Sequence, residues 1–422
     1  MNAQAPQDSQ GPRQVVVVGG GIVGICCGLY LQRDGHEVTI IDQDDPGEGC
    51  SSGSAGQFCP GYCVPVGLPG IVKDLPSMLM DPLGPLVIRW RYLPRLTPWL
   101  LRFVKASSAG RVEAIADALH ALNRNAMIDF APLIERARAE NLIVSNGRMD
   151  LYRSEKAFAK AQTKFELLRS HGVRVEMLKS PQIRDLEPAL GDYYRNGALY
   201  PDMAHTTDTL RFNQLLAEDF ARHGGRILRE KVTDFQIDEA EVVAVITESN
   251  RYQVGNIVLA AGAFSRRLAK KLGSTVPLDA ERGYHVMLPD PGIELSRTIL
   301  DGDHYFALTP MQGGLRLAGT VELASPCAAP NYSRADNLLR AARDAIAQLD
   351  DRGASRWMGC RPSLPDSLPV IGRSPVHRSV YFAFGHGHLG LTGAATTGKL
   401  ITDLIAGRPT AIDATPYRAD RF

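Results

Sequence analysis

Long apolar runs, an excess of one charge and paired cysteines are all missing from this sequence. No uninterrupted run of about 18 apolar residues occurs, so a transmembrane helix is not expected. The 47 Lys and Arg residues nearly balance the 46 Asp and Glu residues, and the net charge of +1 produces no global field that would attract nucleic acid. The seven cysteines are odd in number, so reduced thiols in a cytoplasmic protein are expected. A zinc site at Cys59 and Cys63 is disfavoured because no second pair accompanies them, and no metal is expected.

The length and the two ends of the chain limit its organisation. A chain of 422 residues is long enough for two domains, each with its own core. Residues 1–12 are polar and contain two prolines, which is typical of a disordered leader and not of a signal peptide. Export from the cell is therefore not expected.

A strand, a glycine-rich turn, a helix and a second strand follow one another near the N-terminus. The β-branched run Val15–Val18 predicts a strand buried on both faces of a parallel sheet. The apolar positions at 22–31 predict a packed helix that ends at Gly35, and residues 37–42 predict the second strand. This order predicts a βαβ unit.

The turn within this unit carries a dinucleotide-binding pattern. Gly19, Gly21 and Gly24 form G-x-G-x-x-G between the strand and the helix, where the first glycine allows the tight turn, the second allows close approach of a pyrophosphate and the third allows close helix packing. Asp42 ends the second strand, where its carboxylate can accept hydrogen bonds from an adenosine ribose. The pattern predicts a dinucleotide and leaves FAD and NAD open.

Helices and strands alternate along the rest of the chain. Helical periodicity is found at 111–140, at 154–171 and in a segment that Asp208 can cap and that runs to Arg222. Buried parallel strands are expected at 256–260 and 380–384, and a more antiparallel second sheet is expected from 283–288, 304–309 and 314–320.

The segment 393–399 (GAATTGK) imitates a nucleoside-triphosphate loop. Leu400 replaces the magnesium-binding hydroxyl, and the preceding strand ends well before Gly393. This stretch is therefore expected to be an interior helix whose small residues pack against a close neighbour.

Four later motifs follow the glycine turn in a specific order. They are SSGSAGQFCPGY at 51–62, VLAAGAFS at 258–265, RGYHVML at 282–288, and GCRPSLPDSLPVIG at 359–372 followed by FGHGHLGLTGA at 384–394. With them the chain resembles, over nearly its whole length, the D-amino-acid oxidase-like FAD-dependent oxidoreductase superfamily, and within it the D-amino-acid dehydrogenase and D-hydroxyproline dehydrogenase group.

The resemblance implies an α/β fold with two interleaved domains and FAD as the cofactor. A Rossmann-like FAD-binding domain would be assembled from 13–58, 200–272 and 357–410. An α+β substrate domain, built on a mainly antiparallel sheet, would comprise 59–199 and 273–356.

The resemblance also implies which residues border the cofactor. The loop after the second strand, a backbone contact at the adenine end, a strand end and the C-terminal glycine turn with its helix would all touch FAD. These residues are Ser51, Ser52, Ala55, Gly56, Val232, Ala261, Gly262, Gly385, Gly387, His388, Gly390, Leu391 and Thr392. The N-terminus of that helix would favour negative charge on the reduced flavin ring. Cys360 adjoins, but does not occupy, the position where some relatives tether flavin, so noncovalent FAD is expected.

Candidate residues for substrate chemistry lie in the same motifs. Arg361 is the candidate anchor of a substrate carboxylate, because a guanidinium fork can donate two parallel hydrogen bonds. Tyr284 and Tyr305 are candidate hydroxyl donors, with ordinary sheet packing as the alternative interpretation. His386 and His388 are candidates for proton transfer, or for hydrogen bonds that only support the flavin turn.

The resemblance implies oxidative deamination of a D-amino acid, such as D-proline or hydroxy-D-proline, to the imine and 2-oxo acid by hydride transfer to flavin. Electrons would pass to a quinone or a protein acceptor. The alternatives are an oxidase of glycine, sarcosine or another N-substituted amino acid, a nicotinamide-dependent dehydrogenase, and a non-catalytic dinucleotide-binding subunit of a larger complex.

The segment 64–105 combines apolar residues with five cationic ones. They are Arg89, Arg91, Arg95, Arg102 and Lys105. A lid over the substrate domain with solvated arginines is the favoured interpretation. The alternative is peripheral contact with an anionic membrane, at which a quinone would be reached.

Overall fold

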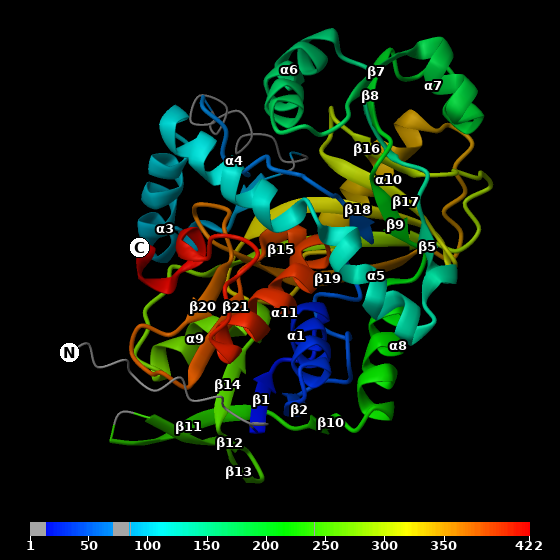
Figure 1. Cartoon of the computed structure of the whole chain (residues 1–422). Helices are drawn as coiled ribbons and strands as arrows, with labels where there is room; N and C mark the ends of the chain where they lie inside the picture. The colour runs from blue at the N-terminus through cyan, green and yellow to red at the C-terminus, as the bar shows by residue number, and fades with distance from the viewer. Residues whose placement is uncertain (1–13, 71–83, 85, 240) are drawn as a thin grey trace.

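Two sheets organise the protein. The computed structural model describes residues 14–70, 84, 86–239 and 241–422, and the expected leader at 1–12 lies outside them. Figure 1 shows a parallel sheet in the lower part of the molecule and a larger sheet above it, with the chain crossing between them several times.

The lower sheet is a six-stranded, mainly parallel sheet. Its order is β10-β2-β1-β14-β21-β20, and only the edge strand β20 is antiparallel to its neighbour. The strands are β1 (Gln14–Val18), β2 (Glu37–Asp42), β10 (Arg226–Arg229), β14 (Asn256–Leu259), β20 (Val370–Arg373) and β21 (Val380–Phe384). The parallel strands expected at 256–260 and 380–384 are thereby confirmed next to the N-terminal βαβ unit.

Helices cover one face of this sheet, and a small antiparallel sheet covers the other. Alternate residues of β1 enter the two cores: Val15 and Val17 face the helices, whereas Val16 and Val18 face the small sheet. The helical layer contains α1 (Ile22–Arg33), α4 (Ala109–Asn123), α5 (Ala126–Ala137), α8 (Thr209–Arg222) and α11 (Gly390–Ala406). The opposite layer contains β11 (Val232–Asp238), β12 (Glu241–Thr247), β13 (Arg251–Gln253) and α9 (Ser265–Lys271).

The helical layer agrees with the sequence except at one break. Asp208 accepts a hydrogen bond from the backbone N–H of Arg211 and caps α8, as expected. The periodic segment 111–140 forms two helices, because the chain leaves helical geometry at Asn125 between α4 and α5. The segment 393–399 lies inside α11, and its small residues pack against α1, as expected.

The larger sheet has nine strands and is mainly antiparallel, as predicted. The path is β19-β15-β18-β17-β16-β6-β8-β7, with β4 added beside β18. The strands are β4 (Leu86–Ile88), β6 (Arg148–Tyr152), β7 (Glu176–Lys179), β8 (Asn196–Tyr200), β15 (Asp279–Leu288), β16 (Thr298–Asp301), β17 (Phe306–Met311), β18 (Gly314–Leu323) and β19 (Ser355–Ser363). Helix α10 (Ser333–Ala345) packs on one face of it.

Short elements connect these layers. A three-stranded sheet joins β3 (Gln57–Phe58), β9 (Ala204–Thr206) and β5 (Ile143–Val144). The remaining α-helices of the described residues are α3 (Leu93–Ala106), α6 (Glu155–Ser170) and α7 (Ser180–Leu186). The interleaved domain boundaries stay a prediction. Strand β19 spans the expected boundary at 357 and pairs with β15 of the nine-stranded sheet.

The cationic apolar segment 64–105 is only partly described, because residues 71–83 and 85 lie outside the described residues. Its helix α3 buries Trp99 and Phe103, whose rings stack with centroids 5.4 Å apart. Trp90 and Leu101 are instead 73% and 67% exposed. No helix in the described part of the chain has the length and apolar character needed to cross a bilayer.

Candidate active site

The glycine turn after β1 allows a close approach of backbone to backbone. Gly19 has a φ of +118°, and a Cβ there would lie 2.4 Å from the carbonyl oxygen of Ala260. A Cβ on Gly24 would lie 1.9 Å from the carbonyl oxygen of Gly19. The N-cap residue of α1 is Gly21, which has no side chain to cap the helix, and no acidic residue lies in the first turn. This end of the helix is therefore suited to bind a phosphate group.

Asp42 lies at the carboxyl end of β2 beside this turn. Its Oδ2 accepts a hydrogen bond from the Gly20 N–H at 2.5 Å, and its Oδ1 accepts one from the Asp44 N–H at 3.0 Å. Burial raises the pKa of the carboxyl group, and these backbone hydrogen bonds oppose that effect. A carboxylate has about four acceptor positions, so Asp42 can still accept hydrogen bonds from a ligand.

Side chains of the nine-stranded sheet donate hydrogen bonds to the backbone carbonyl groups of the loop that follows β2. Arg316 Nη1 donates to the carbonyl oxygens of Ser52 and Ser54, at 3.0 and 2.6 Å. The Thr309 hydroxyl donates to the carbonyl oxygen of Ala55 at 3.0 Å. At the other side of the loop, Ser51 Oγ accepts the Ile22 N–H at the start of α1. The loop is thus fixed between the two sheets.

One cavity of about 1780 Å³ runs along both sheets. The residues predicted to bind FAD or substrate, Ala55 among them, all line this cavity except Gly24 and Ser52. Gly24 and Ser52 instead serve the close packing of the turn and the attachment of the loop. The cavity also continues past Tyr92 and Trp99 to the segment that contains α3.

Arg361 projects into this cavity from β19. It pairs in register with Glu281 of β15, and residues directly opposite in an antiparallel pair share a face of the sheet. A Cβ on Gly283 would lie 2.2 Å from Arg361 Cζ, so the absence of a side chain there makes room for the guanidinium group. Arg361 donates to the carbonyl oxygens of Thr320 and Gly319. Hydrogen bonds among the described residues thus use two of the five N–H donors of the guanidinium group.

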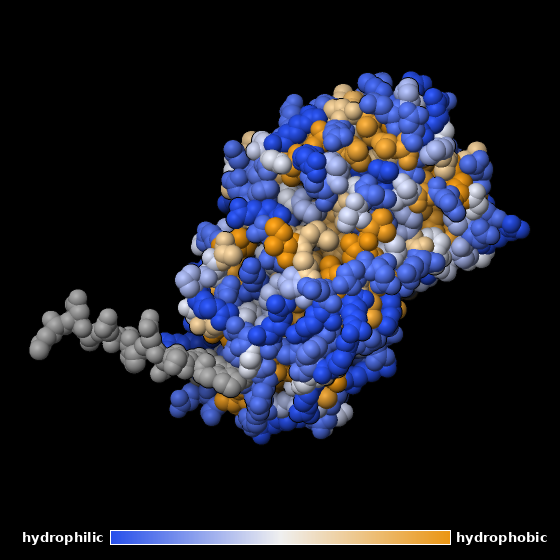
Figure 2. Space-filling model, turned by 45° about the vertical axis from the view of Figure 1, so that its right-hand side comes forward, coloured by the Kyte–Doolittle hydropathy of each residue, from blue (hydrophilic) through white to orange (hydrophobic). Residues whose placement is uncertain are grey.

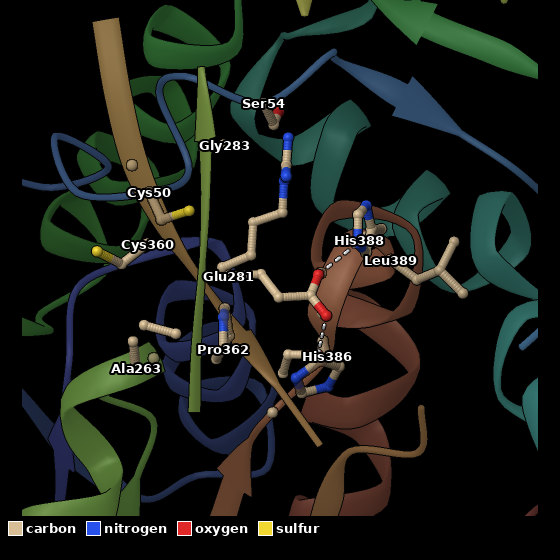
Figure 3. A pocket seen from close by; sticks show the side chains of 18 of the residues that line it. Cys50, Ser54, Ala263, Glu281, Gly283, Cys360, Pro362, His386, His388 and Leu389 are labelled. Atoms are coloured by element: carbon tan, nitrogen blue, oxygen red, sulfur yellow. Dashed lines mark hydrogen bonds and ion pairs between the residues drawn. The ribbon is translucent and has the colours of Figure 1, made fainter. Parts of the chain in front are cut away.

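Glu281 is a buried carboxylate beside this arginine. Its Oε2 lies 2.8 Å from His388 Nε2, and its Oε1 accepts a hydrogen bond from the Ser363 hydroxyl at 2.7 Å. Burial opposes its ionisation, but the hydrogen bonds from His388 and Ser363 and the charge of Arg361 oppose burial, and the pKa of Glu281 lies below its usual value. Figure 3 shows Glu281 and His388 directed at one another from a strand and from the turn that precedes α11.

The other candidates are placed differently around the cavity. His386 is buried, its Nε2 lies 2.8 Å from the Thr397 hydroxyl, and burial lowers its pKa to about 3, so the ring is neutral. Tyr284 packs toward α10, and its hydroxyl donates to Glu322. Tyr305 is 52% exposed at the cavity wall. The structure thus brings Arg361 close to the Glu281–His388 pair and places the Tyr284 hydroxyl on the opposite face of the sheet.

Strained backbone occurs at this cavity. Among the described residues, five non-glycine positions have positive φ, and three of them, Tyr305, Thr320 and Ser367, line the cavity. Such a conformation costs about 1–3 kcal/mol per residue and is often retained at functional sites. The Thr320 carbonyl oxygen is also the one that accepts from Arg361 Nη1 at 2.8 Å. A residue with strained backbone, Thr320, thus supports the candidate anchor Arg361.

Comparison with known proteins identifies the family. Residues 14–404 match the DAO family, described as FAD dependent oxidoreductase. The chain belongs to this family. It is 37% identical over 417 residues to a D-amino-acid oxidase of Bradyrhizobium diazoefficiens (97% of this chain, 99% of the relative). It is also 32% identical over 422 residues to a D-amino acid dehydrogenase of Paramagnetospirillum magneticum (97% and 99%).

The fold of this FAD-dependent oxidoreductase also matches solved structures. A crystal structure of glycine oxidase from Geobacillus kaustophilus superposes with a TM-score of 0.71 at 22% identity, covering 97% of this chain and 100% of that chain. The Rossmann-like sheet combined with a mainly antiparallel substrate sheet is confirmed by this likeness and by the strand order.

The cavity of the FAD-dependent oxidoreductase fits FAD in size and in donor groups. Pockets for small ligands commonly measure about 300–1,000 Å³, so 1780 Å³ accommodates a dinucleotide together with a further ligand. With FAD bound, Asp42 would hold the ribose and the N-terminus of α1 the pyrophosphate. The N-terminus of α11, which lacks a side-chain cap and has no acidic residue in its first turn, would lie at the flavin ring. FAD, and not NAD, is the cofactor of this family.

Sequence reasoning missed Glu281, Ser363 and Trp357. The Trp357 ring stacks on His285, with centroids 5.0 Å apart, and lies where a side chain on Gly53 would be. Glu281 immediately precedes the motif RGYHVML that had been singled out, and strand alternation places residues 281, 283 and 285 on one face. This alternation could have indicated that Glu281 shares a face with Gly283 and His285. The opposite strand had not been predicted, so nothing indicated that this face meets Arg361.

Among the described residues, no group of three or more His, Cys, Asp or Glu side chains is arranged to hold a metal ion. Cys59 lies instead within 3.6 Å of Arg148 Nη1, in a buried network that includes Asp150 and Lys164.

Proposed function

We propose that this enzyme oxidises the carbon–nitrogen bond of a free amino acid, and that D-amino acids are its substrate class. The observation that carries the proposal is the cavity-facing Arg361, which lies beside a buried and ionised Glu281. A cationic fork next to a buried anion is complementary to a zwitterion, which carries a carboxylate and an ammonium group on one carbon atom. The names of the two relatives support D-amino acids as the class.

The residues of the chain bind and orient the substrate in this proposal. FAD, when bound, accepts the hydride that leaves the substrate α-carbon. Arg361 holds the carboxylate and thereby fixes the position of the α-carbon next to it. The substrate ammonium group has to lose one proton to solvent before the hydride leaves. Water then hydrolyses the resulting imine to the 2-oxo acid and ammonia. Such a reaction requires placement and electrostatic complementarity more than a strong protein base.

We further propose D-proline or hydroxy-D-proline as the preferred substrate type and a quinone or protein as the electron acceptor. The support is the likeness of the motifs at 51–62, 359–372 and 384–394 to the dehydrogenase group. The second candidate is an oxidase that uses molecular oxygen, and the 37% identical relative, described as an oxidase, favours it. Glycine, sarcosine and other N-substituted amino acids are the alternative substrates. Contact with the inner face of a membrane through 64–105 would bring a quinone within reach.

One experiment separates these candidates. The purified holoenzyme is mixed anaerobically with a panel of D- and L-amino acids, glycine, sarcosine and D-proline, and bleaching of flavin absorbance is followed. We expect reduction by D-amino acids, fastest with D-proline or hydroxy-D-proline. The reduced enzyme is then mixed either with oxygen or with a soluble quinone, and we expect reoxidation to be at least about tenfold faster with quinone. Reduction by none of these compounds would leave the non-catalytic subunit as the explanation.

A further inference from the structure

Beside Arg361, the Glu281–His388 pair lines the cavity, and the function proposed so far uses the charge of Glu281 but gives His388 no role. Its members come from β15 and from the turn before α11, which are far apart in the sequence. The carboxylate of Glu281 is almost fully buried, whereas the His388 side chain is 41% exposed in the cavity. A buried, ionised carboxylate thus lies behind a histidine that faces the cavity.

The hydrogen bonds of the pair fix the orientation of the histidine ring. His388 Nε2 lies 2.8 Å from Glu281 Oε2, and since an ionised carboxylate only accepts, Nε2 is the protonated nitrogen. In the neutral ring, Nδ1 is then the acceptor. No hydrogen bond to Nδ1 is found among the described residues. Ser363 holds the other oxygen of Glu281, which prevents the carboxylate from rotating away.

We propose that His388, positioned by Glu281, binds the amino group of the substrate through Nδ1 while Arg361 binds the carboxylate. The inference rests on the proposed oxidation of an amino acid. In an α-amino acid the two groups are attached to the same carbon, so a partner for the amine has to lie next to the carboxylate anchor. Glu281 lies next to the anchor because it pairs in register with Arg361. His388 lies there as well, because it is hydrogen-bonded to Glu281.

The alternative histidine fails on geometry. The Nε2 of His386 bonds to Thr397 within α11, and the residue is only 4% exposed. Tyr284 is also directed away, because its hydroxyl bonds to Glu322 beneath α10. The assignment makes His388 a substrate-binding residue and Glu281 a positioning residue, whose negative charge also favours an ammonium group over a neutral ligand.

The test compares two ligands that the enzyme cannot oxidise. 2-Aminoisobutyrate has no hydrogen on its α-carbon, and isobutyrate has no amino group, so each binds without turnover. Dissociation constants are measured on the FAD-loaded enzyme by calorimetry and by the change in flavin absorbance. For the wild type we expect 2-aminoisobutyrate to bind about tenfold more tightly, which is the effect of one or two charge-assisted hydrogen bonds.

Substitutions then separate the two anchors. His388→Leu should reduce the ratio of the two dissociation constants to near one and leave isobutyrate binding unchanged. Glu281→Gln, which keeps the size of the side chain, should reduce the ratio in part. Arg361→Lys serves as the contrasting variant, because it should weaken both ligands alike and preserve the ratio. His223→Leu, at a residue that follows the C-terminus of α8 and does not line the cavity, should change nothing.

A ratio that stays at the wild-type value in both His388→Leu and Glu281→Gln, with FAD bound, would overturn the inference. If His388→Leu does not fold, Glu281→Gln decides alone. Failure of the proposed function gives a different result: no amino acid would reduce the wild-type flavin, and 2-aminoisobutyrate would bind no better than isobutyrate.

Discussion

At the scale of single residues, the site depends on the half-buried guanidinium group of Arg361, which donates no hydrogen bond to a neighbouring side chain among the described residues. Thr320 and Gly319 provide carbonyl oxygens on one side of Arg361, and Gly283 leaves the space that the group fills. These contacts orient the fork without neutralising its charge. The strained Thr320 backbone and Gly283 thus both help to position the Arg361 side chain.

Replacing Arg361 with Ala should reduce the efficiency of flavin reduction by amino acids roughly 30- to 1000-fold, about 2–4 kcal/mol of transition-state binding. The substrate loses charge-assisted hydrogen bonds and alignment together. Lys should restore only part of the rate, because it keeps the charge but not the planar fork. The measurement is the rate of anaerobic flavin reduction against substrate concentration, with FAD content checked by absorbance. Wild-type efficiency in an FAD-loaded Arg361→Ala enzyme would show that the anchor lies elsewhere.

The cysteines near the site bear on how FAD is held. Burial raises the pKa of Cys50 to about 11 and raises that of Cys360 as well, so both thiols are protonated at neutral pH. A thiol without thiolate character is a poor nucleophile for forming a flavin linkage. Acid precipitation should therefore release the yellow colour into the supernatant. Colour that stays in the washed pellet would show a covalent link.

At the scale of elements, the contact between α1 and α11 connects the two halves of the cofactor site. Helix α1 begins at the glycine turn after β1, and α11 begins at the cavity wall, where Gly390 and Leu391 line it. The helices approach closely at Gly398, where a Cβ would lie 2.6 Å from the carbonyl oxygen of Cys26 and 3.0 Å from the Tyr30 ring. The resemblance of 393–399 to a nucleotide loop thus has a packing explanation.

Gly398→Ala should destabilise the enzyme by about 1–3 kcal/mol, the range for overpacking a close contact, and lower its melting temperature by a few degrees. The backbone of α1 cannot yield without moving the glycine turn, so FAD affinity should also fall. Gly110→Ala in α4 is the matched control, because no atom lies within 4 Å of its added Cβ and helix propensity favours Ala. Melting curves and FAD titrations of both variants provide the measurement. If Gly398→Ala melted at the same temperature as the wild type, α1 and α11 could move apart without loss of stability, and the prediction would be wrong.

At the scale of the whole molecule, the surface mixes polar and apolar residues. On the face in Figure 2 most apolar residues are scattered, and several gather across the middle, between the lower and upper parts. The sequence is nearly neutral overall, yet residues 82–112 contain six cationic residues and no Asp or Glu. Within the described part of this stretch, Trp90 and Leu101 are exposed, and α3 also lines the end of the cavity. A cationic apolar surface at that end suits contact with anionic lipids.

The whole enzyme should bind vesicles that contain phosphatidylglycerol more strongly than vesicles of phosphatidylcholine alone, and salt should weaken this binding. The double variant Trp90→Ser with Leu101→Ser should lose most of it, and Arg91→Glu with Arg102→Glu should lose the lipid preference. A matched pair on α8, Arg211→Glu with Arg222→Glu, should bind like the wild type. Vesicle co-sedimentation measures the effect. Equal sedimentation of the surface variants and the wild type would favour the interpretation of this segment as a lid.

The sequence by itself determined the βαβ unit, the dinucleotide turn with Asp42, the family and a minority of the residues that line the cavity. These depend on local rules: strand and helix periodicity, glycines where the backbone approaches closely, and motifs that are contiguous in the chain. It also placed Arg361 in a motif. Glu281, Ser363, Trp357 and the strained Thr320 could not be found in that way, because each acquires its role from a strand or loop distant in sequence. Register between β15 and β19 brings Glu281 beside Arg361, and the turn before α11 adds His388. Only the tertiary structure decides such pairings, since a shift of one residue in register would turn these side chains to the opposite face.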